Sequence, residues 1–360
     1  MFINKDLIII GGGPAGLAAG KIAKDAGIDT LLIERSAFLG GQLVKQTHKF
    51  FGSEKQNAKM RGIDIAKKLE AEIEGLEILL EATVVGVYPD QVVTVLKDDK
   101  YIKYKAKAII AATGASEKFL AFENNDLPGI YGAGAIQTLM NVYGVVPGSD
   151  VVMIGSGNIG LIVTYQLLQA GVNVKAIIEA SPSIGGYKVH ASKVKRMGIP
   201  IYTSKTIKRA IGTDHLEAVE IVSLNESWQE IPNTSEIIEC DTLCISVGLS
   251  PMHQVISMSG AKTKYVSELG GVVAITNEYN QASVPFIFLA GDALGIEEAS
   301  SAMMEGYLTG LYVTKYLNQT HPNYDELVDM YNKELDLLRD GKFGEKTLIG
   351  IRKLKGETYA

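Results

Sequence analysis

The sequence has few cysteines, and their spacing excludes a redox pair. Its 360 residues include two, Cys240 and Cys244, and no CxxC motif occurs. β-Branched neighbours in alternation indicate a strand here, and four residues of a strand span about 13 Å, too far for a disulfide. We therefore interpret both thiols as small packing residues rather than redox or metal-binding groups.

Basic runs and long hydrophobic runs are also missing. With 35 basic and 41 acidic residues the formal charge is −6, and nothing points to nucleic acid or an anionic membrane surface. The N-terminal apolar run stops at glycines after four residues, and no stretch approaches the ~20 apolar residues of a membrane span. The histidines lack carboxylate partners at ligand spacing, so no metal site is predicted. We expect a soluble, cytoplasmic protein.

Glycine, in contrast, is abundant, and its positions suggest a function. In DLIIIGGGPAGLAAG, Gly11, Gly13 and Gly16 follow a predicted strand and open a predicted helix at Pro14. In such a G-x-G-x-x-G turn the first glycine permits the turn, the second lets the backbone approach a pyrophosphate, and the third lets helix and strand pack closely. The phosphates would lie at the helix N-terminus, and Glu34, at the end of the next strand, would accept hydrogen bonds from a ribose.

The same unit occurs a second time, in VVMIGSGNIGLIVTYQLLQAGVNVKAIIEA, with Gly155, Gly157, Gly160 and Glu179. From the first glycine to the acid there are 23 residues in the first copy and 24 in the second. Two copies predict two dinucleotide sites. A carboxylate such as Glu179 accepts from a 2′-hydroxyl and repels a 2′-phosphate, which favours NAD over NADP.

Four basic residues near the second acid leave an alternative open. They either serve a 2′-phosphate or coat an exposed helix. They are Lys188, Lys193, Lys195 and Arg196.

Further strands that end in glycine predict a domain split in sequence. AIIAATGASEKF turns at Thr113 and Gly114, CDTLCISVGLSP ends in glycine, and VPFIFLAGDALG leads into Gly291 and Asp292. Asp292 would hold the sugar-alcohol chain of a flavin dinucleotide; alternatively it caps a helix. The helix from about Ala299 would direct its N-terminus at the flavin ring.

The predicted fold class is α/β, with two Rossmann-like dinucleotide-binding domains and the NAD domain inserted into a discontinuous FAD domain. The FAD domain would comprise 1–115 and 245–322, the inserted NAD(P)-binding domain 116–244, and a helical tail 323–360. Residues 79–108 predict antiparallel hairpins packed on the first domain.

Four ordered motifs resemble the two-dinucleotide-fold flavoprotein superfamily that includes thioredoxin reductase. They are GGGPAG, GGQL at 40–43, ATG at 112–114 and AGDA at 290–293. This resemblance covers roughly residues 5–320. It implies FAD in the split domain and a nicotinamide nucleotide in the inserted one.

Longer segments are similar to one branch of that superfamily, the alpha subunits of sarcosine oxidase and dye-linked proline dehydrogenase and the subunits of opine oxidase and hydrogen cyanide synthase. They are LPGIYGAGAIQTLMNVYGVVPG, IGGYKVHASKVKRMGIPI and GDALGIEEASSAMMEG. Motif by motif, the residues assigned to FAD are Gly11, Gly13, Pro14, Ala15, Gly16, Glu34, Arg35, Gly41, Gln42, Thr113, Gly114, Gly291, Asp292, Glu298 and Ala299. Those assigned to the nicotinamide nucleotide are Gly155, Gly157, Asn158, Ile159, Gly160 and Glu179. No catalytic side chain and no metal ligand is assigned, because the cofactors carry the chemistry.

Two departures from the relatives narrow the function. Thioredoxin reductases carry a redox CxxC in the inserted domain, and its absence here disfavours disulfide reduction. Larger members of the branch hold an iron–sulfur cluster in a cysteine-rich C-terminal segment. The segment YNKELDLLRDGKFGEKTLIGIRKLKGETYA has no cysteine, so we expect any cluster on another polypeptide.

The resulting hypothesis is an FAD-dependent pyridine-nucleotide oxidoreductase that passes a hydride between NAD(H) and FAD. Electrons would continue to a partner flavoprotein and an iron–sulfur subunit of an amine, amino-acid or hydroxy-acid dehydrogenase. The resemblance also implies rotation of the inserted domain during turnover, and a homodimer is common among relatives.

Two other functions and one local question stay open. The chain is alternatively a stand-alone NAD(P)H reductase of ferredoxin, quinone or oxygen, or a flavin-binding scaffold or redox sensor. Near the Gly40–Gly41 turn, His48 with Phe50 and Phe51 lies either beside the flavin or in a loop packed by its own aromatic rings.

Overall fold

The computed structural model describes residues 2–50 and 52–355, and the chain divides into two compact units. The first unit consists of Met1–Ser116 and Ser250–Ala360, and the second of Glu117–Leu249. The chain passes between the units in β7 (Ala115–Glu117) and β16 (Leu249–Pro251). These crossings lie one and five residues after the boundaries expected from the sequence, and the described part of the predicted tail belongs to the first unit.

A parallel sheet forms the centre of the first unit, with strand order β3-β2-β1-β6 and β19 paired to β6. The strands are β1 (Ile3–Ile10), β2 (Thr30–Ile33), β3 (Glu77–Leu79), β6 (Lys100–Ala111) and β19 (Ile287–Leu289). Their apolar runs are buried because helices cover one face of the sheet and other segments cover the opposite face.

Antiparallel strands extend this sheet. β4 (Thr83–Val87) pairs with β5 (Val92–Lys97), which pairs in turn with the first part of β6. That part of β6 alternates exposed and buried residues, as expected for a strand with one face in water. The antiparallel hairpins predicted for 79–108 are therefore confirmed.

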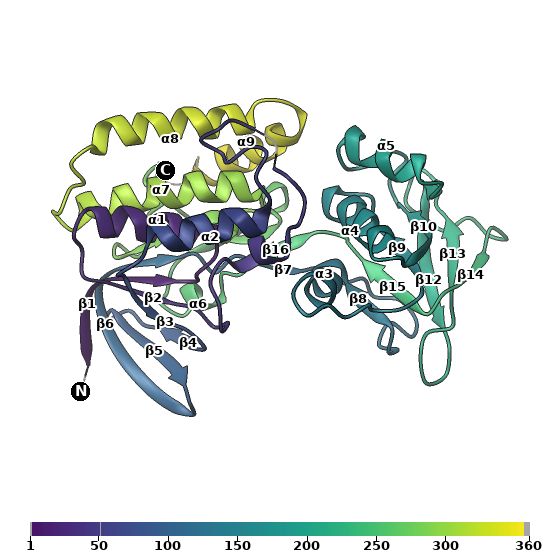
Figure 1. Ribbon diagram of the computed structural model, residues 1–360, viewed down its shortest axis with the longest axis horizontal. Coiled ribbons are helices and arrows are strands. Elements are labelled where there is room, and N and C mark those ends of the chain that lie inside the picture. The colour runs from purple at the N-terminus through teal and green to yellow at the C-terminus, as the bar shows by residue number, and fades with distance from the viewer. Residues whose placement is uncertain (1, 51, 356–360) are drawn as a thin grey trace. The chain divides into compact units, whose positions relative to one another are not determined.

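Helices α1 (Pro14–Asp25) and α7 (Ala299–Tyr316) both contact the sheet of the first unit, and α8 (Tyr324–Arg339) packs on α7 (Figure 1). α7 is buried along most of its length, between the other two. It approaches α1 closely at Gly306, where a Cβ atom would lie 2.2 Å from the Ala15 carbonyl oxygen. Because α8 packs on α7, its Leu335 is part of the core of this unit, with Leu327, Val328 and Tyr331 packed against it.

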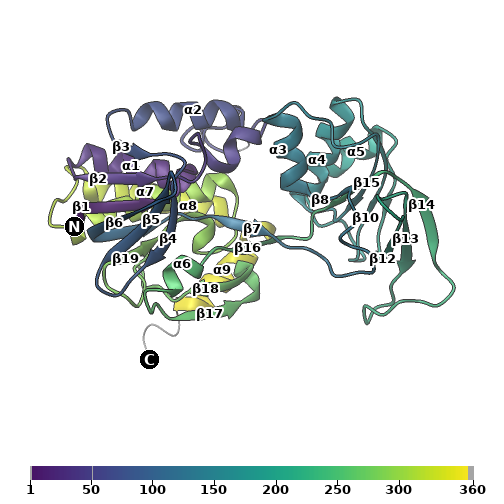
Figure 2. The same cartoon turned by 90° about the horizontal axis from the view of Figure 1, so that it is seen from below.

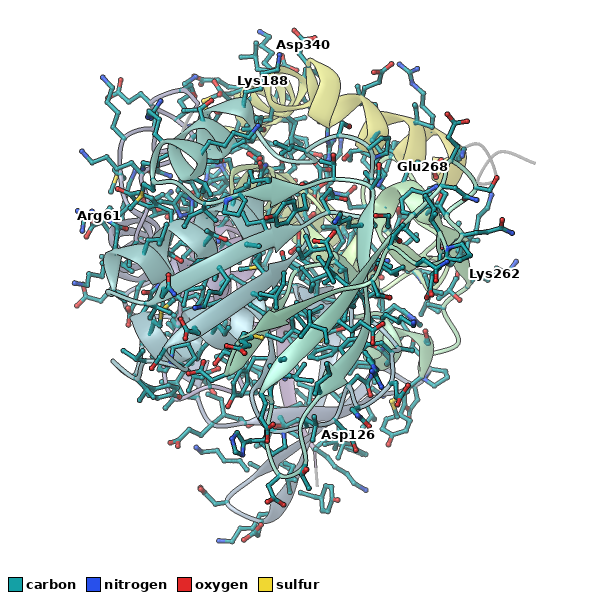
Figure 3. The ribbon with its side chains drawn as sticks, turned by 90° about the vertical axis from the view of Figure 1, so that its right-hand side faces the viewer. Arg61, Asp126, Lys188, Lys262, Glu268 and Asp340 are labelled. Atoms are coloured by element: carbon teal, nitrogen blue, oxygen red, sulfur yellow. The ribbon has the colours of Figure 1, made fainter. Side chains whose placement is uncertain are left out.

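Short elements complete the first unit. They are α2 (Gly62–Glu72), α6 (Gln254–Ser257), α9 (Lys342–Lys355), β17 (Thr263–Val266), β18 (Gly271–Ala274), η1 (Gly41–Lys45), η2 (Ser267–Leu269) and η3 (Gly291–Ala293). α9 lies beside the β17–β18 hairpin (Figure 2). Lys353 of α9 forms an ion pair with Glu268 of η2, and Glu268 is labelled in Figure 3.

The second unit repeats the arrangement. Its parallel sheet has the order β11-β10-β9-β15-β8, and β12, β13 and β14 form a separate antiparallel sheet. The bounds are β8 (Ile130–Gly132), β9 (Asp150–Ile154), β10 (Asn173–Ile178), β11 (Ile201–Tyr202), β12 (Lys205–Ile211), β13 (Ala218–Ser223), β14 (Glu236–Glu239) and β15 (Thr242–Ile245), with helices α3 (Ala133–Asn141), α4 (Asn158–Gln169) and α5 (Lys188–Arg196). The predicted α/β class with two Rossmann-like units is confirmed. Within the described ranges no helix is long and apolar enough to span a bilayer.

Candidate dinucleotide-binding sites

In the first unit, the parallel strands end side by side, and the predicted FAD residues follow these ends. Ile10 is in register with Ile33 and with Ala111, and Ala111 with Leu289. Ligands of open α/β sheets bind at this edge. The predicted residues that come directly after these strand ends, or within three residues of them, are Gly11, Gly13, Glu34, Arg35, Thr113, Gly114, Gly291 and Asp292.

The glycines of the first turn have two different roles. Gly11 has φ +107°, and a Cβ atom there would lie 2.3 Å from the Ala112 carbonyl oxygen. A Cβ on Gly16 would lie 1.9 Å from the carbonyl oxygen of Gly11. A Cβ on Gly13, however, would meet its nearest protein atom, the Cα of Gly41, at 3.9 Å. The fold therefore requires Gly11 and Gly16, whereas Gly13 leaves space next to the helix N-terminus.

The second turn has the same division. Gly155 has φ +98°, and its Cβ would lie 2.1 Å from the Ser246 carbonyl oxygen. A Cβ on Gly160 would lie 2.2 Å from the carbonyl oxygen of Gly155. A Cβ on Gly157 would meet nothing within 4 Å among the residues the structure describes.

Helices α1 and α4 begin directly after these open glycines. Their N-cap residues are Gly13 and Gly157, which have no side chain to satisfy the first-turn N–H groups. Pro14 and Asn158 are the first helical residues. Unoccupied space beside the N–H groups of a helix N-terminus suits a phosphate, so the residues present fit the pyrophosphate of a dinucleotide in both units.

Both strand-end acids also hold the glycine turns in place. Glu34 is buried, and its carboxylate accepts from the N–H of Gly12 at 2.7 Å and of Ser36 at 2.8 Å. Glu179 accepts from the N–H groups of Ser156 and Ser181, both at 2.8 Å. A carboxylate has about four acceptor sites, so capacity for a ribose is left. The sequence indicated the ribose role and missed this structural one.

A glycine pair behind each turn is a second repeated feature. Gly40 donates its N–H to the Gly12 carbonyl and Gly186 donates to the Ser156 carbonyl, both at 2.8 Å. Each pair begins six residues after the acid of its unit, a spacing that would have revealed the repeat in the sequence. In the first unit Gly41, the second glycine of the pair, and Gln42, which follows it, are both exposed.

In the second unit, side chains add to this contact. The Ser156 hydroxyl oxygen accepts from the Gly185 N–H at 3.1 Å, and the Asn158 side-chain oxygen accepts from the Tyr187 N–H at 2.8 Å. Asn158, predicted to contact the nucleotide, therefore also orders the neighbouring loop. Ile159, also predicted, is 37% exposed on the first turn of α4.

Asp292 lies in η3, beside the start of α7. Its Oδ1 accepts from the Glu297 N–H at 3.3 Å, and the N-cap of α7 is Glu298, so the helix-cap alternative for Asp292 is wrong. Burial raises the pKa of Asp292 to about 7, and the nearby Glu297 charge adds to this shift. Ala299 is the first residue of α7, and the Glu298 side chain is exposed.

The remaining predicted residues of the first unit are arranged around this edge. The Thr113 hydroxyl donates to the Met252 carbonyl at 2.7 Å, which fixes the turn before Gly114. Ala15 is buried, and a Cβ on Gly291 would lie 2.8 Å from its methyl group. The rings of His48 and Phe50 stack with centroids 5.5 Å apart, as expected for a loop packed by its own aromatics, while Phe51 lies outside the described residues.

The basic residues of α5 differ in what they contact. Lys193, Lys195 and Arg196 occupy its last turn, where cations stabilise the helix dipole. The Lys193 ammonium lies 3.7 Å from the ring centroid of Tyr165. Lys188, the first residue of α5, is exposed (Figure 3). The last-turn residues thus fit the helix-coating interpretation.

The cysteines form no reactive pair. Both are buried and free. Burial raises the pKa of Cys240 to about 12 and that of Cys244 well above its ordinary value. Across residues 2–50 and 52–355, no cluster of three or more His, Cys, Asp or Glu side chains could hold a metal ion.

The sequence profile of a known family covers most of the chain. The profile described as pyridine nucleotide-disulphide oxidoreductase matches residues 5–306. The chain belongs to the pyridine nucleotide-disulphide oxidoreductase family. This family is one of oxidoreductases, and membership implies that FAD and a nicotinamide nucleotide are bound.

Relatives with curated names agree with the branch inferred from the motifs. The chain is 27% identical to the hydrogen cyanide synthase subunit HcnB of Pseudomonas protegens, over 85% of this chain and 69% of that subunit. It is 27% identical to sarcosine oxidase subunit alpha of Corynebacterium sp., over 85% of this chain. The matched region is 32% of that alpha subunit, so the chain spans about a third of its length.

A solved structure gives the same result. The L-proline dehydrogenase of P. horikoshii matches with a TM-score of 0.73 and 25% identity, over 93% of this chain and 59% of that one. The resemblance to this oxidoreductase branch is confirmed.

Proposed function

We propose that this oxidoreductase passes a hydride between NAD(H), bound in the second unit, and FAD, bound in the first, and delivers electrons to or from a partner subunit. The complete enzyme would oxidise an amine, amino acid or hydroxy acid on another chain. One observation carries this proposal: a glycine turn with one open position is present in each unit, tied in each case to a buried or half-buried strand-end acid.

Each residue type has a defined task in the proposal. The open positions at Gly13 and Gly157 admit the pyrophosphates, and the N-termini of α1 and α4 bind them. Glu34 and Glu179 bind the adenosine riboses, and the Glu179 carboxylate selects NAD(H) by repelling a 2′-phosphate. Asp292 binds the sugar-alcohol chain, and the α7 N-terminus stabilises negative charge at the flavin. When bound, the cofactors supply the chemistry, exchange of a hydride between nicotinamide C4 and flavin N5.

The partner subunit is proposed from the relatives' names, which describe a subunit of hydrogen cyanide synthase and a subunit of sarcosine oxidase. Both buried thiols support a route that does not use a dithiol of this chain, because the thiolate is the reactive form of cysteine. We propose a second flavoprotein chain and an iron–sulfur chain as the partners.

Two measurements test the proposal in sequence. The purified protein is first reconstituted with FAD and then mixed anaerobically with NADH while the visible flavin absorbance is followed. Bleaching is expected, and a protein that takes up no FAD, or stays oxidised with both NADH and NADPH, contradicts the proposal. Affinity purification from native cells then tests whether a flavoprotein chain and an iron–sulfur chain copurify, as we expect. Rapid turnover of this chain alone with ferredoxin, quinone or oxygen would identify a stand-alone reductase instead.

A further inference from the structure

Two segments far apart in sequence flank the phosphate-binding turn of the first unit. The first flank, residues 41–50 and 52–57, begins at Gly41, where a Cβ would lie 2.8 Å from the Cα of Gly13. The second flank, residues 291–305, begins at Gly291, where a Cβ would lie 2.8 Å from the Cβ of Ala15. Both flanks therefore contact the first turn of α1, where the FAD pyrophosphate is proposed to bind.

Helix α8 holds the first flank through Glu334. One carboxylate oxygen of Glu334 accepts from the Ser53 hydroxyl and from the Gln56 side-chain amide, both at 2.8 Å. Ser53 and Gln56 are also joined to each other, because the Ser53 N–H donates to the Gln56 side-chain oxygen at 3.0 Å. Glu334 is 8% exposed and Gln56 3% exposed, so these bonds are shielded from water.

The same helix holds the second flank through Arg339. Its Nε donates to both carboxylate oxygens of Glu297, at 3.1 and 3.2 Å, and its Nη2 donates to Glu305. The other oxygen of Glu305 accepts from the Gly291 N–H at 3.1 Å. Arg339 is therefore linked through the Glu305 carboxylate to the backbone N–H of Gly291. Through the Glu297 carboxylate it is linked to the segment in which the Glu297 N–H donates to Asp292.

Charge makes Arg339 difficult to replace. It faces Glu297 and Glu305, whose side chains are 8% and 7% exposed, and Asp292 lies beside the same group. Removing one partner of a buried ion pair leaves an unpaired buried charge, which is strongly unfavourable. The arginine is thus the cation that allows three carboxyl groups to lie together at this edge of the first unit.

We propose that α8 is a clamp on the FAD site, in which Glu334 and Arg339 are positioning residues that hold the two flanks against the first turn of α1. This inference rests on the proposed FAD site. It assigns a role to a helix that contains none of the predicted cofactor-binding residues. Neither residue is expected to contact the cofactor.

The test compares Arg339→Lys, Arg339→Met and Gln56→Met with Lys333→Met, which removes an exposed cation from the same helix. Two quantities are measured: amide hydrogen exchange across both flanks in the apoprotein, and the rate of FAD release from the full-length holoprotein. We expect FAD release to rise about tenfold or more in Arg339→Met and less in Arg339→Lys, which keeps the charge but loses the fork of hydrogen bonds. Exchange should rise in residues 291–298 for both Arg339 variants and in residues 53–57 for Gln56→Met, with Lys333→Met unchanged.

The outcomes separate the clamp from the proposed function. If the wild-type protein binds FAD, and Arg339→Lys and Gln56→Met match Lys333→Met in exchange and in FAD release, the clamp is wrong while the cofactor site stands. If the wild-type protein binds no FAD, the proposed function fails. Should Arg339→Met not fold, Arg339→Lys and Gln56→Met still decide, because Arg339→Lys keeps a cation beside Glu297 and Glu305, and Gln56→Met leaves Glu334 its hydrogen bond from the Ser53 hydroxyl.

Discussion

Glu179 accepts two hydrogen bonds from Ser156, one from its N–H at 2.8 Å and one from its hydroxyl at 2.6 Å. The acid that is proposed to select the nucleotide thus also fixes the residue between the first two glycines of the turn. In the first unit Gly12 occupies the equivalent place, and only its N–H binds Glu34. The second turn is therefore tied to its acid by one bond more than the first.

Nucleotide preference can be tested at this acid. In Glu179→Ser combined with Ala180→Arg, the repulsion of a 2′-phosphate is lost and a cation is added. We expect the NADPH-to-NADH ratio of kcat/KM to rise by roughly 10- to 100-fold. Steady-state kinetics with both nucleotides measure it, and Glu179→Gln serves as the variant that removes charge alone. An unchanged ratio means that the carboxylate does not contact the ribose.

The open glycine of the second turn offers a substitution that spares the fold. Gly157→Asp introduces a favourable N-cap residue whose carboxylate takes the N–H groups of α4 and repels a phosphate. We expect the variant to keep its bound flavin and its thermal stability, while reduction by NADH slows about 100-fold or more. Stopped-flow reduction under anaerobic NADH is the measurement.

Gly155 is the matched contrast to Gly157. Gly155→Ala places a Cβ 2.1 Å from a backbone oxygen at a residue with φ +98°. We expect it to lower the free energy of unfolding by more than about 1 kcal/mol, because a non-glycine residue is strained there and must displace the Ser246 backbone. Urea denaturation measures this loss. Equal stability of the Gly155 and Gly157 variants would contradict the division of roles between them.

The pH dependence of stability is expected to follow Asp292. Burial raises its pKa from the ordinary value of 3.8 to about 7 in the folded protein. Between these values the folded state binds more protons than the unfolded state, so stability falls as pH rises through this window. Burial and the nearby Glu297 charge also raise the pKa of Glu305, so its titration adds to this fall.

Asp292→Asn removes the first of these titrations and keeps an acceptor for the Glu297 N–H. At pH 8 the apoprotein variant should be more stable than the wild type, and the two should converge only below pH 3.8, where Asp292 is protonated in both the folded and the unfolded state. Chemical denaturation at several pH values provides the comparison, and parallel curves for the two proteins would exclude the raised pKa. Separately, Asp292→Ala should weaken flavin retention, and a variant that stays fully loaded would contradict the proposed contact.

The thiols are expected to be inert in the native protein. Both Cys240 and Cys244 are buried with raised pKa values, so little thiolate is present near neutral pH. A thiol reagent such as dithionitrobenzoate should react only after denaturation, and Cys240→Ala should be reduced by NADH at the wild-type rate. Fast labelling of the folded protein, together with loss of flavin reduction in Cys240→Ala, would instead support electron transfer through a dithiol of this chain.

Local patterns predict much of this fold, and long-range contacts explain what they miss. The strand, turn and helix around Gly11 lie within a few residues of one another, so their spacing alone indicates the turn. Ser53 and Glu334, in contrast, are 281 residues apart, and no periodicity connects them. The sequence predicts the helical tail 323–360, but it does not predict which residues contact helix α8 within that tail. The raised pKa of Asp292 also depends on burial, which composition does not reveal.

The discontinuous first unit has a consequence for biosynthesis. The second unit is one uninterrupted stretch, Glu117–Leu249, whereas the first unit needs β19, α7 and α8, all of which are translated after it. As the chain emerges from the ribosome, the second unit is complete first and can fold while translation continues. If α8 is a clamp, a nascent chain cannot retain FAD tightly until Arg339 has left the exit tunnel. FAD would then bind after synthesis of the chain rather than during it.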